Sequence, residues 1–273
     1  MEWYEILLIV VAACVLLGAL IYLFILIRPR KYRHPDPILL TSYAHRGLHG
    51  GGIPENSLAA FERACEAGYG IELDVQLSSD GKVMVFHDYS LTRMTGRKEK
   101  LSELTASELA TLRLADTDQT IPTLVEVLEL VDGRVPLLVE LKGENLDTAL
   151  CEKLAVLLTG YKGAYCIESF NPLLLRGMQK HLPVAFYGLL YTNACREKGK
   201  RTLLYTALSA MCLNCVARPH FIAYDYRERK SLPVRITTKF YKAPRFIWTV
   251  RDADELAKAH SLGEYPIFEG IET

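Results

Sequence analysis

Short apolar runs that alternate with amphipathic stretches are the feature that most restricts the fold of this chain. Each run has the length of one strand, and each stretch has the apolar spacing of a helix. Such alternation favours parallel strands with helices outside. The predicted strands are Ser42–His45, Tyr69–Val75, Val83–His87, Pro136–Lys142, Ala164–Ser169, Val184–Leu190, Phe221–Tyr226, Arg245–Val250 and Pro266–Gly270. The predicted helices are Asn56–Ala67, Leu104–Arg113, Thr123–Val131, Leu146–Leu158, Leu173–His181 and Ala253–Ser261.

The predicted domain, residues 42–273, has the size of an α/β barrel. Nine strand candidates exceed the eight strands of such a barrel, so at least one is wrong or peripheral. Between Asp74 and His87 there is room for a turn at Ser79-Asp80-Gly81 but not for a crossover helix. A parallel crossover normally needs about a dozen residues or more. If the fold is a barrel, we therefore expect its second connection to be irregular.

An uninterrupted apolar run, Ile6–Ile27, carries no charge. At ~1.5 Å per residue, it spans the ~30 Å hydrocarbon core of a bilayer. A cleaved signal peptide is the alternative, but the segment Met1–Glu5 contains two acids and no base. We therefore predict a transmembrane anchor over residues 1–28, followed by a proline-containing linker over residues 29–41.

The bases after the apolar run predict the orientation of the protein. Arg28, Arg30, Lys31 and Arg33 follow the run directly. The positive-inside rule places this flank, and the domain behind it, on the cytoplasmic side of the membrane. Of the seven cysteines, Cys14 lies in the apolar run, and the other six show no regular disulfide spacing, which agrees with this location. We therefore expect a single-pass membrane protein with a cytoplasmic catalytic domain.

Charge is unevenly distributed although the formal net charge is zero. Residues 41–150 carry 10 bases against 18 acids, and residues 151–273 carry 18 bases against 11 acids. The first half therefore supplies the carboxylates that a metal site requires. The basic second half is either a solvated face or a surface that faces anionic lipid. We do not expect nucleic-acid binding, because no recognised module accompanies the bases.

Carboxylates lie inside two of the predicted strands. Glu72 and Asp74 are two residues apart, so they project to the same face of one strand. Glu140 and Lys142 repeat this spacing in another strand. Three carboxylates inside a barrel are costly unless they are paired or bound to a cation. Ligand sets made only of oxygen favour Mg²⁺ or Ca²⁺ over zinc.

Two histidines end apolar strands. His45 precedes Arg46 and a glycine-containing loop, and His87 ends the strand VMVFH. Catalytic residues of barrel enzymes gather at the C-terminal ends of the strands. Two histidines can supply an acid and a base near neutral pH, and Arg46 and Lys142 would complement a phosphate. Together these residues predict a metal-dependent phosphodiesterase.

The string HRGLHGGGIPENSLAAFERACEAGYGIELDVQLSSDGKVMVFHD resembles the signature of the glycerophosphodiester phosphodiesterase family. Further matches are IPTLVEVL, VELK, ESFNP and WTV, so the resemblance runs from His45 to Val250. It implies a TIM-type (β/α)₈ barrel. It also implies hydrolysis of glycerophosphodiesters to glycerol 3-phosphate and an alcohol.

The resemblance also implies the roles of individual residues. It assigns Glu72, Asp74 and Glu140 to one divalent cation, Mg²⁺ or Ca²⁺, and it makes His45 and His87 the general acid and base. The residues expected to bind phosphate or substrate are Arg46, Lys142, Glu55, Asn56 and Trp248. Asn56 is also placed to cap the helix that follows it.

The C-terminal part departs from the family pattern. Trp248-Thr249-Val250 is followed by Arg251, where the family often has asparagine. The last predicted strand lacks the family's usual acid, and Glu269 either substitutes for it or is merely terminal.

A second apolar segment, Thr202–Val216, contains the pair Cys212 and Cys215. We expect the two thiols to share a helix face and to pack, because a structural zinc site needs four ligands. The segment is markedly apolar for a surface helix, which suggests a lid or a membrane-facing patch.

Two other functions are compatible with the sequence. A lysophospholipase D-like enzyme would use the same site on lysophospholipids in the bilayer, and the anchor favours it. A membrane-anchored binding protein without activity would lack at least one of the histidines or metal carboxylates. All five are present, so hydrolysis of glycerophosphodiesters is the leading hypothesis. The oligomeric state is not predicted.

Overall fold

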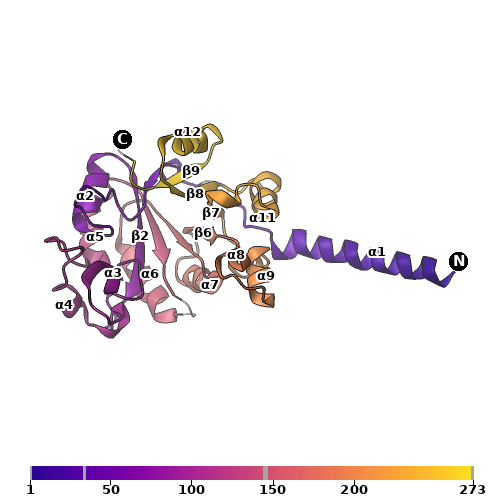
Figure 1. Cartoon of the computed structure of the whole chain (residues 1–273), viewed down its shortest axis with the longest axis horizontal. Coiled ribbons are helices and arrows are strands. Elements are labelled where there is room, and N and C mark those ends of the chain that lie inside the picture. The colour runs from indigo at the N-terminus through magenta and orange to yellow at the C-terminus, as the bar shows by residue number, and fades with distance from the viewer. Residues whose placement is uncertain (1, 33–34, 144–146, 272–273) are drawn as a thin grey trace.

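The computed structural model describes residues 2–32, 35–143 and 147–271. Within this part of the chain, eight parallel strands close into a barrel, because β1 pairs with both β2 and β9 (Figure 1). The strands are β1 (Tyr43–Ala44), β2 (Gly70–Leu77), β3 (Val83–Val85), β4 (Leu137–Leu141), β5 (Tyr165–Ser169), β6 (Phe186–Tyr191), β7 (Phe221–Asp225), β8 (Arg245–Val250) and β9 (Tyr265–Phe268). The predicted TIM-type barrel is confirmed.

Helices lie outside the ring of strands (Figure 1). Those of eight residues or more are α1 (Trp3–Ile21), α2 (Leu58–Glu66), α5 (Leu124–Val131), α6 (Thr148–Gly160), α7 (Pro172–His181) and α12 (Ala253–Ser261). The shorter ones are α3 (Thr92–Thr95), α4 (Ala106–Leu109), α8 (Ala194–Glu197), α9 (Leu203–Ser209), α10 (Asn214–Ala217) and α11 (Leu232–Arg235). Single turns of other helix types are η1 (Tyr22–Leu26), η2 (Pro37–Leu39), η3 (Leu101–Glu103), η4 (Tyr226–Glu228) and η5 (Ile236–Phe240).

Local capping sets where the helices begin. Thr123 and Glu126 form a capping box at the start of α5. At α2 the cap is Ser57, whose hydroxyl accepts a hydrogen bond from the backbone of Ala60. The prediction that Asn56 caps this helix is wrong. Asn56 adopts a left-handed backbone with φ of 52° and turns its amide into the barrel.

The irregular second connection is a hairpin. β3 runs antiparallel to β2, with Val75 opposite Val85. Among the nine predicted strands, β3 is therefore the one outside the parallel ring, and it ends two residues before His87. The predicted helix Leu104–Arg113 shortens to α4 in the described structure. Its neighbouring leucines are used in turns that cover a separate small core around Met84.

The barrel interior changes character along the strand axis. Near the N-terminal ends, large side chains such as Tyr43, Phe186, Phe221 and Phe246 fill it. Gly188 on β6 makes room for Phe221, because a Cβ there would lie 2.0 Å from its ring. Towards the C-terminal ends, the inward positions become polar. Apolar packing therefore closes one end of the barrel and leaves the other end for chemistry.

The N-terminal helix is continuous over Trp3–Leu26, and by length and composition it could cross a membrane. Its end packs on the barrel, where Ile27 is fully buried. Arg30 donates its backbone N–H to the carbonyl of Pro219, and the ring of Tyr32 lies 5.1 Å from that of Phe186. The described part of the expected linker thus runs along the barrel. Two predicted positions, Arg33 and Leu146, lie outside the described residues.

The segment Thr202–Val216 forms two short helices, α9 and α10, rather than one. Cys212 lies in the turn between them, and Cys215 donates a hydrogen bond to its carbonyl. The prediction that both thiols share one helix face is therefore wrong, because the chain bends between them.

Candidate active site

Three buried carboxylates gather at the mouth of the barrel. Glu72 and Asp74 alternate with Leu73 along β2, so both project inward. The strand register places Glu140 of β4 opposite Asp74. One oxygen of each carboxylate lies within 4.8 Å of the others. The structure therefore brings together the three residues that the sequence grouped.

Cationic and amide groups compensate Asp74 most strongly. Lys142 Nζ lies 2.9 Å from Asp74 Oδ1 and 2.7 Å from Glu140 Oε1. Arg46 Nε lies 3.6 Å from Asp74 Oδ2, which also accepts a hydrogen bond of 2.8 Å from Asn56. Burial disfavours the charged carboxylate, but the cations, Lys142 first, outweigh burial. The pKa of Asp74 is therefore lowered.

The remaining acids are undercompensated. Burial, followed by repulsion from Asp74, raises the pKa of Glu72 well above its usual range. Burial raises the pKa of Glu140 to about 7, although Lys142 opposes the shift. Glu168 on β5 is also buried, and its Oε2 accepts no hydrogen bond from any described residue. The site thus holds more buried acid than its lysine and arginine neutralise.

This excess of acid fits a divalent cation. Charged groups in a dry interior are stable only when paired or bound to a metal. The donors available are carboxylate oxygens, which suit Mg²⁺ or Ca²⁺. Glu72, Asp74 and Glu140 have the spacing to share one such ion.

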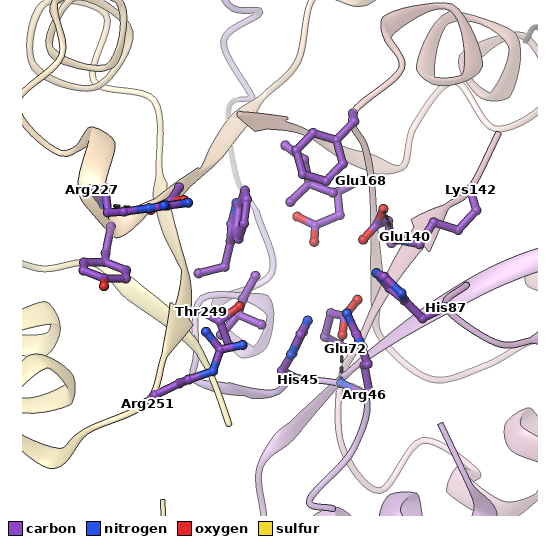
Figure 2. Close-up of a pocket in the computed structure, with 16 residues that line it drawn as sticks. His45, Arg46, Glu72, His87, Glu140, Lys142, Glu168, Arg227, Thr249 and Arg251 are labelled. Carbon is purple, nitrogen blue, oxygen red and sulfur yellow. Dashed lines mark hydrogen bonds and ion pairs between the residues drawn. The ribbon is translucent and has the colours of Figure 1, made fainter. Parts of the chain in front are cut away.

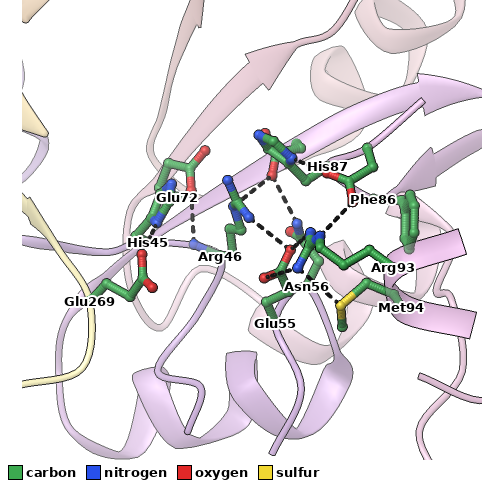
Figure 3. Close-up of polar contacts among 12 residues, drawn as sticks. His45, Arg46, Glu55, Asn56, Glu72, Phe86, His87, Arg93, Met94 and Glu269 are labelled. Carbon is green, nitrogen blue, oxygen red and sulfur yellow. Dashed lines mark hydrogen bonds and ion pairs between the residues drawn. The ribbon is translucent and has the colours of Figure 1, made fainter. Parts of the chain in front are cut away.

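His45 is fixed by a carboxylate from the other end of the domain. Its Nδ1 lies 2.9 Å from Oε2 of Glu269, which follows β9 (Figure 3). The hydrogen bond from His45 lowers the pKa of Glu269 to about 2. An ionised carboxylate only accepts, so Nδ1 carries the proton. Burial lowers the pKa of His45, although Glu269 opposes this, so the neutral ring keeps Nε2 unprotonated.

A tight turn at Arg46 and Gly47 follows the first histidine. Arg46 has a φ of 57°, and its backbone N–H donates to Glu72 Oε2 at 2.8 Å. Gly47 has a φ of 80°, and a Cβ there would meet Ala60 and Phe61 at 2.9 Å. Glycine is therefore required for the turn to pack against α2. This explains physically why glycine occupies position 47.

His87 lies in the loop after β3 and joins a network of ion pairs. Its Nδ1 contacts Asp88 Oδ1 at 2.6 Å. Arg93 bridges Asp88 and Glu55, with one contact of 2.6 Å to each. Glu55 in turn accepts a hydrogen bond of 2.8 Å from Arg46 (Figure 3). The network ties the loop of His87 to the turn at Arg46, and burial lowers the pKa of His87.

A single pocket of about 410 Å³ collects most of these side chains (Figure 2). The predicted site residues on its wall are His45, Arg46, Glu72, His87, Glu140, Lys142 and Trp248. Asp74 is fully buried behind them. Glu55 and Asn56 do not line this pocket. They contact two residues of the site, Arg46 and Asp74 respectively.

Nine further residues line the pocket and were not predicted as site residues; the charged and large aromatic ones among them include Glu168, Phe170, Asp225, Arg227 and Arg251. Glu168 lies in the string ESFNP. A carboxylate within an otherwise apolar predicted strand could have identified it as a site residue from the sequence. Arg227 Nε donates to Asp225 at 2.9 Å. Phe170 packs edge-to-face on Trp248. Arg251, where the family often has asparagine, contacts Glu269 at 3.1 Å.

Comparisons with known proteins agree with this geometry. The model of the glycerophosphoryl diester phosphodiesterase family matches residues 45–268. A glycerophosphodiester phosphodiesterase from Caldanaerobacter subterraneus subsp. tengcongensis is 38% identical over 177 residues, which cover 61% of this chain and 72% of the relative.

Solved structures share the fold. A glycerophosphodiester phosphodiesterase from Thermotoga maritima superposes with a TM-score of 0.65 at 27% identity, over 87% of this chain and 95% of that one. An Oleispira antarctica phosphodiesterase, in complex with the product sn-glycerol-3-phosphate, superposes with a TM-score of 0.70 at 24% identity. That match covers 85% of this chain and 94% of the other.

Proposed function

The chain belongs to the glycerophosphoryl diester phosphodiesterase family and is a phosphoric diester hydrolase, and from that premise we propose that it uses one divalent cation, Mg²⁺ or Ca²⁺, to release glycerol 3-phosphate and an alcohol. The observation that carries the proposal is the cluster of Glu72, Asp74 and Glu140 on a pocket that His45 and His87 also line. The product held by the Oleispira phosphodiesterase supports the choice of glycerol 3-phosphate.

The three clustered carboxylates would hold the cation. When bound, a divalent ion supplies Lewis-acid stabilisation to an oxygen of the phosphate. The other groups of the chain then bind and orient the diester. Lys142 neutralises Asp74 and Glu140 from the side, and Trp248 with Phe170 forms an aromatic wall.

Proton transfer is assigned to the two histidines. Each holds its Nδ1 against a carboxylate, Glu269 for His45 and Asp88 for His87. This leaves Nε2 of each ring to exchange a proton. One histidine takes the proton of the water that attacks phosphorus, the bond from phosphorus to the leaving oxygen breaks, and the other histidine protonates that oxygen. The guanidinium of Arg46 lies on the same pocket and stabilises negative charge that develops on the phosphate.

We further propose that Trp3–Leu26 anchors the enzyme in a membrane. The helix is long and apolar enough, and most of its surface is exposed. The bases that follow it favour a cytoplasmic position of the barrel. The domain division is then an anchor over residues 1–28, a linker over residues 29–41 and a catalytic domain over residues 42–273.

Choline release from glycerophosphocholine tests the proposal. We expect turnover with Mg²⁺ or Ca²⁺ and none after chelation. His45→Ala and His87→Ala should each lower kcat by about 10²–10⁴-fold. Glu72→Gln should weaken metal activation, whereas Glu62→Gln, which changes a surface acid paired with Arg134, should not. Full turnover in the presence of a chelator would contradict the metal requirement.

A further inference from the structure

Two surface segments of the barrel flank the end of the N-terminal helix. The hydroxyl of Tyr22 donates to the carbonyl of Ala210, which directly follows α9, at 3.0 Å. The hydroxyl of Tyr241, which directly follows η5, donates to the carbonyl of Leu23 at 2.6 Å. Figure 1 shows α9 and α11 on either side of the point where α1 leaves the barrel. The segments that contain α9 and α11 are therefore fixed beside the last turn of the helix.

The length of the helix sets the depth of these two segments in the proposed membrane. α1 has 19 residues, and at ~1.5 Å per residue it is about 28 Å long. The hydrocarbon core of a bilayer is about 30 Å thick. When α1 fills that core, η1 lies at the boundary between hydrocarbon and water. Because Tyr22 and Leu23 of η1 bond to the two segments, the segments then lie at the level of the lipid head groups.

Both segments carry exposed apolar side chains next to exposed bases. Leu203 is 90% exposed and Leu204 57% exposed in α9. Leu232 of α11 is 64% exposed and Phe240 of η5 62% exposed. Together with the neighbouring bases, we call these side chains the basic-apolar surface. Its members are Lys198, Lys200, Arg201, Leu203 and Leu204 in the first segment and Leu232, Arg235, Lys239, Phe240 and Lys242 in the second.

The charge of this region has one sign over long stretches of the chain. Residues 198–224 and residues 229–251 contain no acid. Arg28, Arg30 and Lys31, which follow the helix, add three exposed bases at the same end of it. Anionic lipids attract basic segments that lie close to a membrane, and apolar side chains beside the bases enter the head-group boundary. Charge and apolar exposure therefore favour the same partner, an anionic leaflet.

We propose that the basic-apolar surface binds the anionic head groups of the leaflet in which α1 ends. The inference rests on the membrane anchor of the proposed function and goes beyond it, because it gives the barrel a second membrane contact that depends on lipid charge. The two segments belong to the connections that follow β6 and β7, at the end of the barrel where the catalytic pocket opens. The contact thus holds the pocket close to the leaflet.

Trypsin protection of the full chain in vesicles tests the proposal. The exposed residues Lys198, Lys200 and Arg201 lie between α8 and α9 and are cleavage sites. Exposed Lys98 is a reference site beside α3, which lies on the side of the barrel opposite α1 (Figure 1). The measured quantity is the rate of cleavage between α8 and α9 divided by the rate after Lys98. Both cuts need a barrel that faces outward, so this ratio does not depend on the orientation of the chain in the vesicles.

The cleavage ratio should depend on lipid charge. We expect it to fall about tenfold when phosphatidylglycerol is added to vesicles of phosphatidylcholine, because the bases then bind lipid. NaCl at ~1 M, where the Debye length is about 3 Å, should restore most of the cleavage. Equal ratios in the two kinds of vesicle overturn the proposal. Protection that follows the ratio of protein to lipid, and not the content of phosphatidylglycerol, shows contact between copies of the chain and also overturns it.

Two double variants test the apolar and the basic side chains separately. Leu203→Ser with Leu204→Ser removes the apolar part of the first segment. Lys239→Gln with Lys242→Gln removes bases of the second segment and leaves the cleavage sites intact. Each variant is compared with its own ratio in phosphatidylcholine, and each should lose most of the effect of phosphatidylglycerol. Full protection in both variants overturns the role of these side chains.

Controls separate this inference from the anchor on which it rests. Lys82→Gln with Lys100→Gln removes two exposed bases near α4, on the side opposite α1, and should keep the protection. Equal rates of cleavage after Lys98 in detergent show that the variants fold. Alkaline carbonate extraction of the same vesicles tests the anchor, and extraction of the full chain overturns both the anchor and this inference. A chain that stays in the pellet but is cut equally in both kinds of vesicle overturns this inference alone.

Discussion

Each histidine at the mouth of the barrel depends on a carboxylate that it contacts through Nδ1. For His45, burial lowers the pKa, and the hydrogen bond to Glu269 partly restores it. For His87, burial lowers the pKa, and Asp74 and Asp88 oppose this. The carboxylates thus set both the tautomer and the proton affinity of the proposed acid and base.

Replacement of Glu269 should shift the pH profile of hydrolysis. Glu269 raises the pKa of His45, so its loss lowers that pKa further. The limb of the kcat/KM profile that follows His45 should then move to lower pH in Glu269→Ala. Loss of the orienting bond should also lower kcat by about 10–100-fold. Glu269→Gln keeps an acceptor near Nδ1, so it should show the pH shift with a smaller loss of kcat. An unchanged profile in both variants would count against proton transfer by His45.

The ion-pair network around Arg93 makes a second residue-scale prediction. Arg93 joins Asp88 to Glu55 and so orients both His87 and Arg46. Arg93 acts through Asp88 and Glu55 rather than by binding substrate. Arg93→Ala should therefore lower kcat/KM about 10–100-fold, as is typical for residues that position others. Arg97→Ala is the matched control, since Arg97 pairs with exposed Glu99. Equal activity of the two variants would show that the network does not position the site.

At the scale of elements, β6 and β7 pack closely near the N-terminal ends of the barrel strands. Phe221 lies over Gly188, where even a methyl group has no room. The ring also contacts Phe186 and Phe246, so it has no space to retreat. One glycine therefore permits the aromatic layer beneath the active site.

Gly188→Ala should destabilise the barrel by about 1–3 kcal/mol through overpacking. The measurement is the denaturant midpoint of the purified protein. Gly160→Ala is the control, because Gly160 ends α6 and nothing lies within 4 Å of the position that a Cβ would take there. That substitution should be neutral or slightly stabilising, since alanine favours helices over glycine. A neutral Gly188 variant would contradict the close packing.

At the scale of the whole molecule, the N-terminal helix is joined to the barrel by specific bonds. The hydroxyl of Tyr241 donates to the carbonyl of Leu23 at 2.6 Å, and Ile27 is buried in the core that the helices share with the sheet. The barrel is thus held beside the helix end by direct contacts. The position of the barrel relative to the helix is therefore set by these contacts as well as by the length of the connecting segment.

Deletion of residues 2–21 should release the enzyme from membranes and leave glycerophosphocholine hydrolysis unchanged. The deletion keeps Tyr22–Ile27 and so keeps the contacts with the barrel. Alkaline carbonate extraction measures release, and protease access in sealed vesicles measures orientation. The full chain should stay in the pellet with its barrel on the cytoplasmic side. Extraction of the full chain would contradict a membrane-spanning anchor.

The sequence by itself determined the strands and most of the chemistry. All nine predicted strands exist within the described residues, because runs such as VPLLVELK and APRFIWTV have the length and the apolar composition of one buried strand. Glu72 and Asp74 share a face because strand geometry alternates side chains, which is a local property. The family motifs then connected these positions to a known activity.

Only the tertiary structure decided which distant groups meet. The antiparallel direction of β3 depends on its pairing with β2, and the contact of Glu269 with His45 requires closure of the ring between β1 and β9. A second cavity, of about 480 Å³, lies beside the catalytic pocket, and it likewise needs α9 and the following turn to fold over β6. Such contacts join residues far apart in the chain. Their formation is governed by packing of the whole barrel, which local sequence patterns do not encode.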